Sequence, residues 1–205
     1  MAQTIFAAIL HREGNIDDTA FELLTAARQI DPEAEVTAVV FGSGDHIDAV
    51  CSTLADGFPS VWKIADDALA YPNAEVLRGM LARILPEKPL VLMAHEHFGM
   101  DFGPGLAVKC NAAYVPDVLA VEKPTGGSLT LVRQEFSGMV STHVACDLAG
   151  GAVISLRPGS FAAAEVSGVG GTIVDKSAEA LEGGLPGARR RYLEVTFLRN
   201  GSVLI

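Results

Sequence analysis

The chain has 205 residues, of which 49% are hydrophobic and 20% charged, and its formal net charge is −10. This apolar content is enough for a globular core and excludes an intrinsically disordered chain. The acidic balance argues against nucleic acid as the main partner, because nucleic-acid-binding surfaces are usually basic. No apolar run reaches the roughly 18 residues of a membrane span, and the three widely spaced cysteines favour reduced thiols. We therefore expect a cytoplasmic protein that is not inserted in a membrane.

The first half of the chain alternates between two hydrophobic periodicities. Continuous apolar runs predict strands buried on both faces, at 5–10, 36–41, 61–65 and 90–94. Apolar residues spaced three and four apart predict helices, at 17–30, 45–54 and 74–85. We expect a loop over 95–105 and a further helix over 106–112. Four strand–helix units in succession predict an α/β fold, a mainly parallel, Rossmann-like sheet with helices on both faces.

The pattern changes after Pro116. Short β-rich segments separated by turn residues predict antiparallel strands that extend one edge of the sheet, at 118–122, 128–136, 139–146 and 152–157. We place an α/β domain over 1–160. Residues 161–205 are rich in small residues and glycine and predict an extended arm, with a basic patch at 189–191 and a strand-like stretch at 192–198.

Two short motifs suggest a ligand, each with a structural alternative that we favour. Gly42-Ser43-Gly44 lies between a predicted strand and helix, where backbone amides can hold a phosphate. It lacks both the third glycine of a dinucleotide fingerprint and the lysine of a phosphate-binding loop, so a tight turn explains it better. His95-Glu96-His97 with Asp101 is the most metal-like cluster, but two histidines two residues apart point to opposite sides of an extended backbone. We predict no metal site.

Nucleophilic catalysis has little support in the sequence. There is no Gly-x-Ser-x-Gly elbow, and Ser141-Thr142-His143 lies in a predicted strand. Cys51, Cys110 and Cys146 occupy apolar periodic positions that suit a core. We therefore predict no catalytic residue.

Two arginines lie in otherwise apolar strands. Arg133 comes shortly before a turn, and Arg157 opens the sequence Arg157-Pro158-Gly159-Ser160-Phe161. An arginine in such surroundings needs an acidic or carbonyl partner. The partner is either internal, as a salt bridge or loop clamp, or it belongs to another subunit or a cofactor.

These segments resemble a known family. Arg133-x-x-Phe136-Ser137-Gly138, followed by 157–161, is similar to a motif pair in the alpha subunit of electron transfer flavoproteins. Residues 22–28, and the stretch from 98–101 through 115–118, resemble that family in the same order. The resemblance covers about residues 3–161. It implies an adenine nucleotide alpha-hydrolase-like fold, as in the N-terminal domain of that subunit.

The chain departs from the family pattern in two places. Residues 103–106 lack the Pro-Arg pair that is usual there, and no Ser-Gly-Gly-Arg-Gly motif opens a flavin domain. The resemblance therefore extends to the first domain alone. We expect either a fragment or a naturally short protein, and residues 161–205 would lead toward the missing flavin domain.

The resemblance implies an electron carrier, not a catalyst in its own right. This domain would supply scaffold and subunit interface, and our interface candidates are Arg133, Gly138, Arg157, Gly159 and Phe161. FAD would sit mainly on the absent domain, and AMP or a second FAD on a beta subunit, so we expect no complete cofactor site here. Dehydrogenases would donate the electrons. A face meant for the beta subunit could cause self-association of the isolated domain.

A second interpretation comes from a different functional class. The chain could be a stand-alone adenine-nucleotide-binding domain of related architecture. Its site would lie at the carboxyl ends of the first and fourth predicted strands, near His11 and residues 95–99.

Overall fold

The computed structural model describes residues 3–125, 128–166 and 168–193. The strands are β1 (Thr4–Ile9), β2 (His11–Arg12), β3 (Asn15–Ile16), β4 (Glu35–Gly42), β5 (Ser60–Ala65), β6 (Leu90–Ala94), β7 (Ala113–Thr125), β8 (Ser128–Glu135), β9 (Val140–Asp147), β10 (Ala152–Leu156) and β11 (Thr172–Asp175). The helices are α1 (Thr19–Ile30), α2 (His46–Ala55), α3 (Ala74–Ile84), α4 (His97–Cys110) and α5 (Ser177–Ala180). Two short 3₁₀ turns lie at Asp67–Leu69 and Leu148–Gly150.

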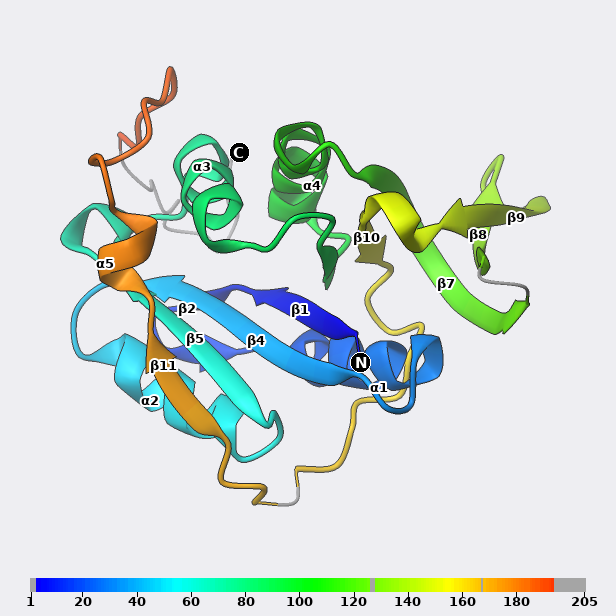
Figure 1. Cartoon of the computed structure of the whole chain (residues 1–205), viewed down its shortest axis with the longest axis horizontal. Helices are drawn as coiled ribbons and strands as arrows, with labels where there is room; N and C mark the ends of the chain where they lie inside the picture. The colour runs from blue at the N-terminus through cyan, green and yellow to red at the C-terminus, as the bar shows by residue number, and fades with distance from the viewer. Residues whose placement is uncertain (1–2, 126–127, 167, 194–205) are drawn as a thin grey trace, which may run out of the picture.

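One nine-stranded sheet organises the domain, in the order β11-β5-β4-β1-β6-β10-β7-β8-β9 (Figure 1). From β11 to β7 every neighbouring pair is parallel. The hairpin strands β8 and β9 continue the sheet in antiparallel pairing, as the sequence predicted. The fold is therefore α/β with a mainly parallel sheet and an antiparallel extension, and β2 and β3 form a separate small hairpin.

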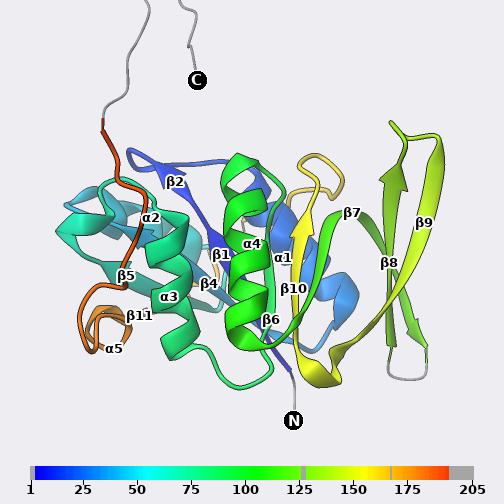
Figure 2. The ribbon, with the colours of Figure 1, turned by 90° about the horizontal axis from the view of Figure 1, so that it is seen from above.

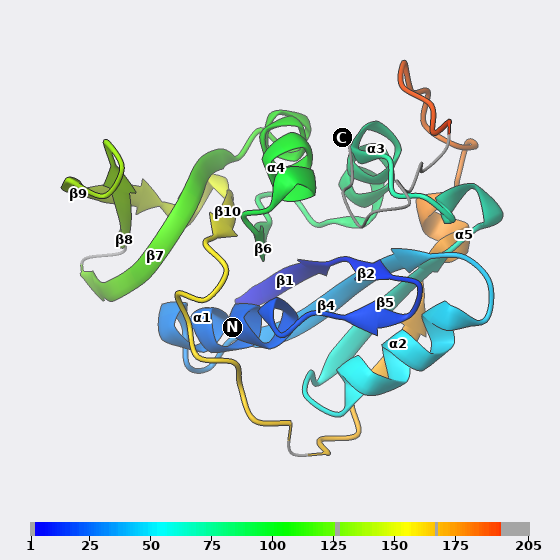
Figure 3. The ribbon, with the colours of Figure 1, turned by 180° about the vertical axis from the view of Figure 1, so that it is seen from behind.

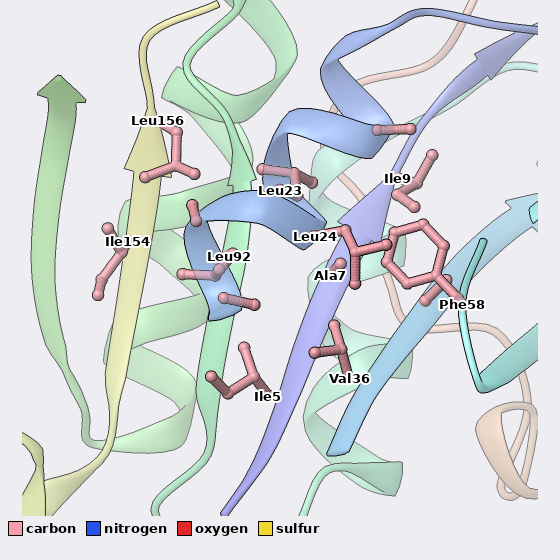
Figure 4. Packing of buried hydrophobic residues seen from close by; sticks show 14 of the residues in the cluster. Ile5, Ala7, Ile9, Leu23, Leu24, Val36, Phe58, Leu92, Ile154 and Leu156 are labelled. Carbon is pink, nitrogen blue, oxygen red and sulfur yellow. The ribbon is translucent and has the colours of Figure 1, made fainter. Parts of the chain in front are cut away.

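Helices cover both faces of the sheet. Figure 3 shows α1 and α2 on one face and α3 with α4 on the other, and Figure 2 shows α3 and α4 side by side across the strands. The face under α1 and α2 is filled by aliphatic side chains from the strands and from α1, together with the ring of Phe58 (Figure 4). A second cluster, which includes Phe6, Phe102 and Leu106, fills the opposite face. Burial of the strands on both faces explains their continuous apolar runs.

The helix α4 corrects our prediction of a loop over 95–105. It begins at His97 and passes through Pro104. The glycines that suggested a loop serve close packing instead: a Cβ at Gly99 would collide with the Ala94 carbonyl, and one at Gly103 would lie 2.7 Å from the Tyr114 ring. Glycine in a helix costs stability on its own, but here it lets the helix approach the sheet.

The strand β10 differs from the predicted run of antiparallel strands. It lies between β6 and β7 and pairs with both of them in parallel. All five of its residues are buried. A strand that is buried on both faces requires neighbours and covering helices on each side, so this sequence fits the interior of the sheet and not its edge.

After β10 the chain runs past α1 and the end of α2 to β11, at the edge of the sheet beside β5 (Figure 1). Backbone hydrogen bonds fasten this path to Phe21, Asp56 and Ala55, and it ends in β11, which pairs with β5. The sequence patterns did not predict β11 or α5. The stretch at 192–198 lies outside the described residues from 194 onward.

Candidate functional site

A pocket of about 470 Å³ opens at the carboxyl ends of β1 and β6. The chain continues from β1 to β4 on one side and returns to β6 on the other, so the pocket lies where the strand order reverses. Ligands of open α/β sheets bind at this kind of position. The walls come from β1, β6, the β2–β3 hairpin and the first turns of α1 and α4.

The two helix N-termini at the pocket differ in their free donors. In α1, the carboxylate of Asp17 accepts a hydrogen bond from the Thr19 N–H at 2.9 Å. In α4, the side chain of Glu96 makes no capping hydrogen bond. The first-turn amides of α4 are therefore open to a ligand, and the helix dipole favours a negative charge there.

His11 supports one wall of this pocket. Its Nδ1 accepts a hydrogen bond from the Gly14 N–H at 3.3 Å, and its Nε2 is buried against β4 without a hydrogen-bond partner among the described residues. A Cβ at Gly42 would lie 2.5 Å from Nε2. Burial lowers the pKa of His11 despite an opposing effect of the Phe41 backbone, and the nearby His46 lowers it further. The imidazole is therefore neutral near pH 7.

Gly42-Ser43-Gly44 thus has local roles. Gly42 makes room for the His11 ring, while Gly44 has a φ of +62° and open space around it. Neither glycine lines the pocket. This geometry fits the tight turn that we favoured over a phosphate loop.

Asp117 is the centre of a second polar group, which the sequence analysis did not single out. Its carboxylate accepts two hydrogen bonds from Arg157, at 2.8 Å from Nε and 2.5 Å from Nη2. Arg157 also donates from Nη1 to Gln134 Oε1 at 3.1 Å. Asp117 itself has a φ of +60° and lies where the register between β7 and β10 shifts. Arg157 therefore has an internal partner and ties the end of β10 to β7 and β8.

Ser155 and His95 adjoin Asp117 in an order that resembles a hydrolytic triad. His95 Nδ1 lies 2.9 Å from Ser155 Oγ, and its Nε2 lies 4.0 Å from Asp117 Oδ1. Ser155 is 0% exposed, and Arg157 already occupies the Asp117 carboxylate. A nucleophile must reach its substrate, so this geometry fits a structural network better than a catalytic triad.

Arg133 and Gly138 lie on the β8–β9 hairpin. Arg133 Nη1 lies 3.5 Å from Glu135 Oε1, while its Nε is buried without a partner among the described residues. Gly138 has a φ of +86° in the connecting turn. Phe136 and Met139 flank this turn and are 76% and 84% exposed.

Gly159 and Phe161 are held to α1 by one buried carboxylate. Glu22 accepts hydrogen bonds from the Gly159 N–H at 2.9 and 3.0 Å and from the Phe161 N–H at 3.4 Å. Phe161 itself is buried. Sequence reasoning missed Glu22, because its hydrogen-bond donors are distant in the chain: Gly159 lies 137 residues away.

The residues considered for metal binding and nucleophilic catalysis have other partners. Asp101 pairs with Arg190 at 2.6 Å, and His143 lies 2.9 Å from a Glu122 oxygen. Among the described residues there is no group of three potential metal ligands. Burial raises the pKa of the Cys51 thiol to about 11 and also raises those of Cys110 and Cys146. Cys51 and Cys146 are core thiols, as expected, whereas Cys110 is only partly buried.

The nine-stranded sheet, its helices on both faces and the pocket at the strand-order reversal define a Rossmann-like domain of the adenine nucleotide alpha-hydrolase-like class. Residues 5–181 match the electron transfer flavoprotein domain. The chain therefore belongs to the electron transfer flavoprotein family. Over the part of the chain that the structure describes, no helix has the length and apolar character needed to cross a membrane.

Individual relatives confirm the resemblance to the alpha subunit. The chain is 32% identical to the electron transfer flavoprotein subunit alpha of Syntrophomonas wolfei over 79% of its own length and 50% of that protein. It is 27% identical to the Bacillus subtilis subunit alpha, over 65% of this chain and 41% of that one. Protein FixB of Clostridium saccharobutylicum is 23% identical over 73% of this chain and 46% of that protein. The chain thus spans about half the length of the curated relatives it matches.

The Asp117–Arg157 pair predicts a pH-dependent stability. Hydrogen bonds from Arg157 hold the pKa of Asp117 below its usual range, despite an opposing effect of burial. A carboxylate whose pKa is lowered by folding stabilises the fold at any pH above its unfolded-state pKa. This stabilisation is lost as the pH falls through the folded-state pKa. Asp117→Asn is expected to cost about 1–2 kcal/mol at pH 7, and this cost shrinks toward pH 3.

Urea unfolding at pH 7, 5 and 3 measures this difference. Asparagine also tolerates a positive φ, so the substitution adds little backbone strain. The control is Asp48→Asn, because the Asp48 side chain pairs with Lys63 but is 70% exposed; it should change stability by less than about 0.5 kcal/mol. A pH-independent loss in Asp117→Asn would contradict the assignment.

Proposed function

We propose that the chain is the N-terminal scaffold and subunit-interface domain of an electron transfer flavoprotein alpha subunit. The observation that supports this most strongly is the family match over residues 5–181, together with relatives named as alpha subunits of about twice this length. In the whole protein, FAD held mainly outside these residues would accept electrons from dehydrogenases and pass them on. This chain would act as part of an electron carrier and not as a catalyst.

The β8–β9 hairpin is the surface we assign to a beta subunit. It extends away from the body of the domain (Figure 2), and β9 forms the outer edge of the sheet. Three apolar side chains at its end, Phe136, Met139 and Val140, are exposed. An exposed apolar patch beside an unpaired strand edge is typical of a protein–protein interface.

The five interface candidates contribute to this surface in two ways. Arg133 and Gly138 belong to the hairpin itself. Arg157 reaches the hairpin through Gln134, and Gly159 and Phe161 fix the chain that leaves β10. We propose that the last three position the interface, whereas Arg133 contacts the partner directly.

The test isolates the chain, tagged at Met1, from its native cells together with whatever binds it. We expect a second subunit of similar size and the absorbance bands of a flavin. The double variant Phe136→Ala/Met139→Ala should lower the copurified subunit at least about tenfold, because buried aromatic and thioether contacts at interface centres carry much of the affinity. Arg133→Ala and Arg157→Ala should also weaken assembly.

Val108→Ala is the matched control, because Val108 is 82% exposed on α4, away from the hairpin. It should leave the complex unchanged. A colourless preparation without a second subunit would overturn the proposed function. A flavin-containing complex that the hairpin variant leaves intact would overturn only the choice of interface.

A further inference from the structure

The β2–β3 hairpin, residues 11–16, forms one wall of the pocket at the ends of β1 and β6. His11, Arg12, Asn15 and Ile16 all line that wall. The hairpin is a sheet of its own, with two residues in each strand, and it adds no strand to the nine-stranded sheet. An isolated two-stranded hairpin is at best marginally stable in water. Side-chain contacts must therefore hold this wall in place.

The turn of this hairpin has an unfavourable backbone conformation. Glu13 has a φ of +50° and Gly14 a φ of +85°, and a tight two-residue turn of this kind needs both positive values. Glycine adopts such a value readily, whereas in glutamate the Cβ crowds the backbone. The Asn15 side chain supports the turn by donating from Nδ2 to the Arg12 carbonyl at 3.3 Å. The closed turn depends on further support, and His11 supplies part of it.

The His11 ring closes the turn only in its neutral form. Its Nδ1 accepts a hydrogen bond from the Gly14 N–H at 3.3 Å, so the ring hydrogen is on Nε2. That Nε2 is buried against Gly42 of β4 and has no hydrogen-bond partner among the described residues. A second proton goes to Nδ1, where it faces the Gly14 N–H. Protonation therefore replaces a hydrogen bond by two opposed donors and places a positive charge beside β4.

The surroundings of His11 oppose its protonation. Burial lowers the pKa of His11, the Phe41 backbone partly offsets this effect, and His46 lowers the pKa further. His46 begins α2 and packs against the same turn, since a Cβ at Gly14 would lie 3.4 Å from its Nδ1. The other charged or titratable side chains of the hairpin, of the start of α2 and of the pocket lining are Arg12, Glu13, Asp17, Asp45, Glu96 and His97. Among the described residues, none of the carboxylates in this group pairs with His11.

We propose that the β2–β3 hairpin is a pH-sensitive flap on this pocket, closed while the His11 ring is neutral and loosened when the ring takes up a proton. The open flap binds one more proton than the closed flap, so acidification favours opening. Opening begins below the pKa of an exposed histidine, about 6.5, and increases at most about tenfold for each further pH unit. The flap uses this chain's own residues and is independent of the scaffold role proposed above.

Amide hydrogen exchange at Gly14, followed by NMR on the full chain with any subunit that copurifies, tests the proposal. The measured quantity is the protection factor, which already corrects for the direct effect of pH on exchange. We expect it to fall at least about fivefold between pH 7.5 and pH 5.5. The amide of Val39, which is buried in β4, should keep its protection. An NMR titration of the His11 ring should give a pKa below that of an exposed histidine.

His11→Gln separates the flap from other effects of acid, because glutamine can still accept from the Gly14 N–H but does not titrate. Protection at Gly14 should then be the same at both pH values within about twofold. His143→Gln is the matched control, because His143 lies on β9 with a 52% exposed side chain; it should keep the full pH effect.

Three results would overturn the proposal. The first is equal Gly14 protection at pH 7.5 and pH 5.5 in the unsubstituted chain, and the second is a full pH effect in His11→Gln. The third is a parallel loss of protection at Val39, which would show that the whole domain opens. If His11→Gln does not fold, the ring titration decides in its place: a His11 pKa at or above about 6.5 means that closing the flap does not oppose protonation.

Discussion

Gly151→Ala is expected to destabilise the protein by more than about 3 kcal/mol. Gly151 has a φ of +77° and a ψ of 161°, a conformation that side chains other than glycine hardly adopt. A Cβ there would lie 2.5 Å from the Lys88 carbonyl carbon and 2.8 Å from the Pro89 oxygen. Because both contacts are to backbone, no side-chain rotation relieves them.

The position of Gly151 makes this strain costly. Its carbonyl accepts a hydrogen bond from the Ala113 N–H at 3.1 Å, at the start of β7. The next residue, Ala152, donates to the Pro89 carbonyl at 2.8 Å beside β6. A shift of the backbone at 151 therefore disturbs the pairing of β10 with both of its neighbours.

The neighbouring glycine provides a matched control. A Cβ at Gly150 would meet nothing within 4 Å, and its φ is not in the positive range. Gly150→Ala should therefore be neutral within about 0.5 kcal/mol. Urea unfolding of both variants gives the comparison, and similar stabilities for the two would show that the approach at Gly151 is unimportant.

Glu22→Ala is expected to cost about 2–3 kcal/mol. Glu22 is 8% exposed, and its carboxylate is the acceptor for the amides of Gly159 and Phe161, both of which follow β10. Alanine leaves both amides without that acceptor, and the Phe161 amide is buried, where a lost partner costs more than it would at the surface. The chain after β10 should then loosen from α1.

Hydrogen exchange of the 159–161 amides and urea unfolding measure the two effects of the Glu22 substitution. Glu22→Gln keeps one oxygen acceptor and should recover part of the loss. Glu33→Ala removes an exposed acid just after the same helix and should change stability by less than about 0.5 kcal/mol. Unchanged exchange at Gly159 in Glu22→Ala would contradict the anchoring role.

Local periodicity was enough to locate four strands of the parallel sheet and three of the helices that cover it. Apolar runs coincide with β1, β4, β5 and β6, and the spacing of three and four residues locates α1, α2 and α3. These patterns work because each element buries one stripe or both faces against its neighbours. The order of the motifs around Arg133 and Arg157 was enough to indicate the family that the comparisons confirm.

The helix α4 could not be predicted from local rules. Gly99, Gly103 and Pro104 all disfavour a helix by themselves. Their use depends on Ala94 and Tyr114, which lie close to the two glycines only in the folded domain. Tertiary packing therefore overrides intrinsic propensity at this point.

The candidate sites were likewise predicted only in part from the sequence. Strand ends predicted that His11 and residues 95–99 would lie near the same edge, and His11 and the first turn of α4 do line one pocket. The sequence required a partner for Arg157 but could not choose Asp117, which is 40 residues away. Such pairings follow from the register of β7 and β10, and no local pattern encodes that register.

The sequence by itself thus determined the α/β class, most of the elements and the family, because these depend on residues close together in the chain. Only the tertiary structure decided that β10 enters the sheet between β6 and β7. It also decided that β11 forms the edge of the sheet beside β5, at the opposite end from β9. It also decided that Glu22 and Asp117 hold the chain around β10. These features depend on contacts between distant segments, whose free energy arises only when the sheet and its covering helices assemble.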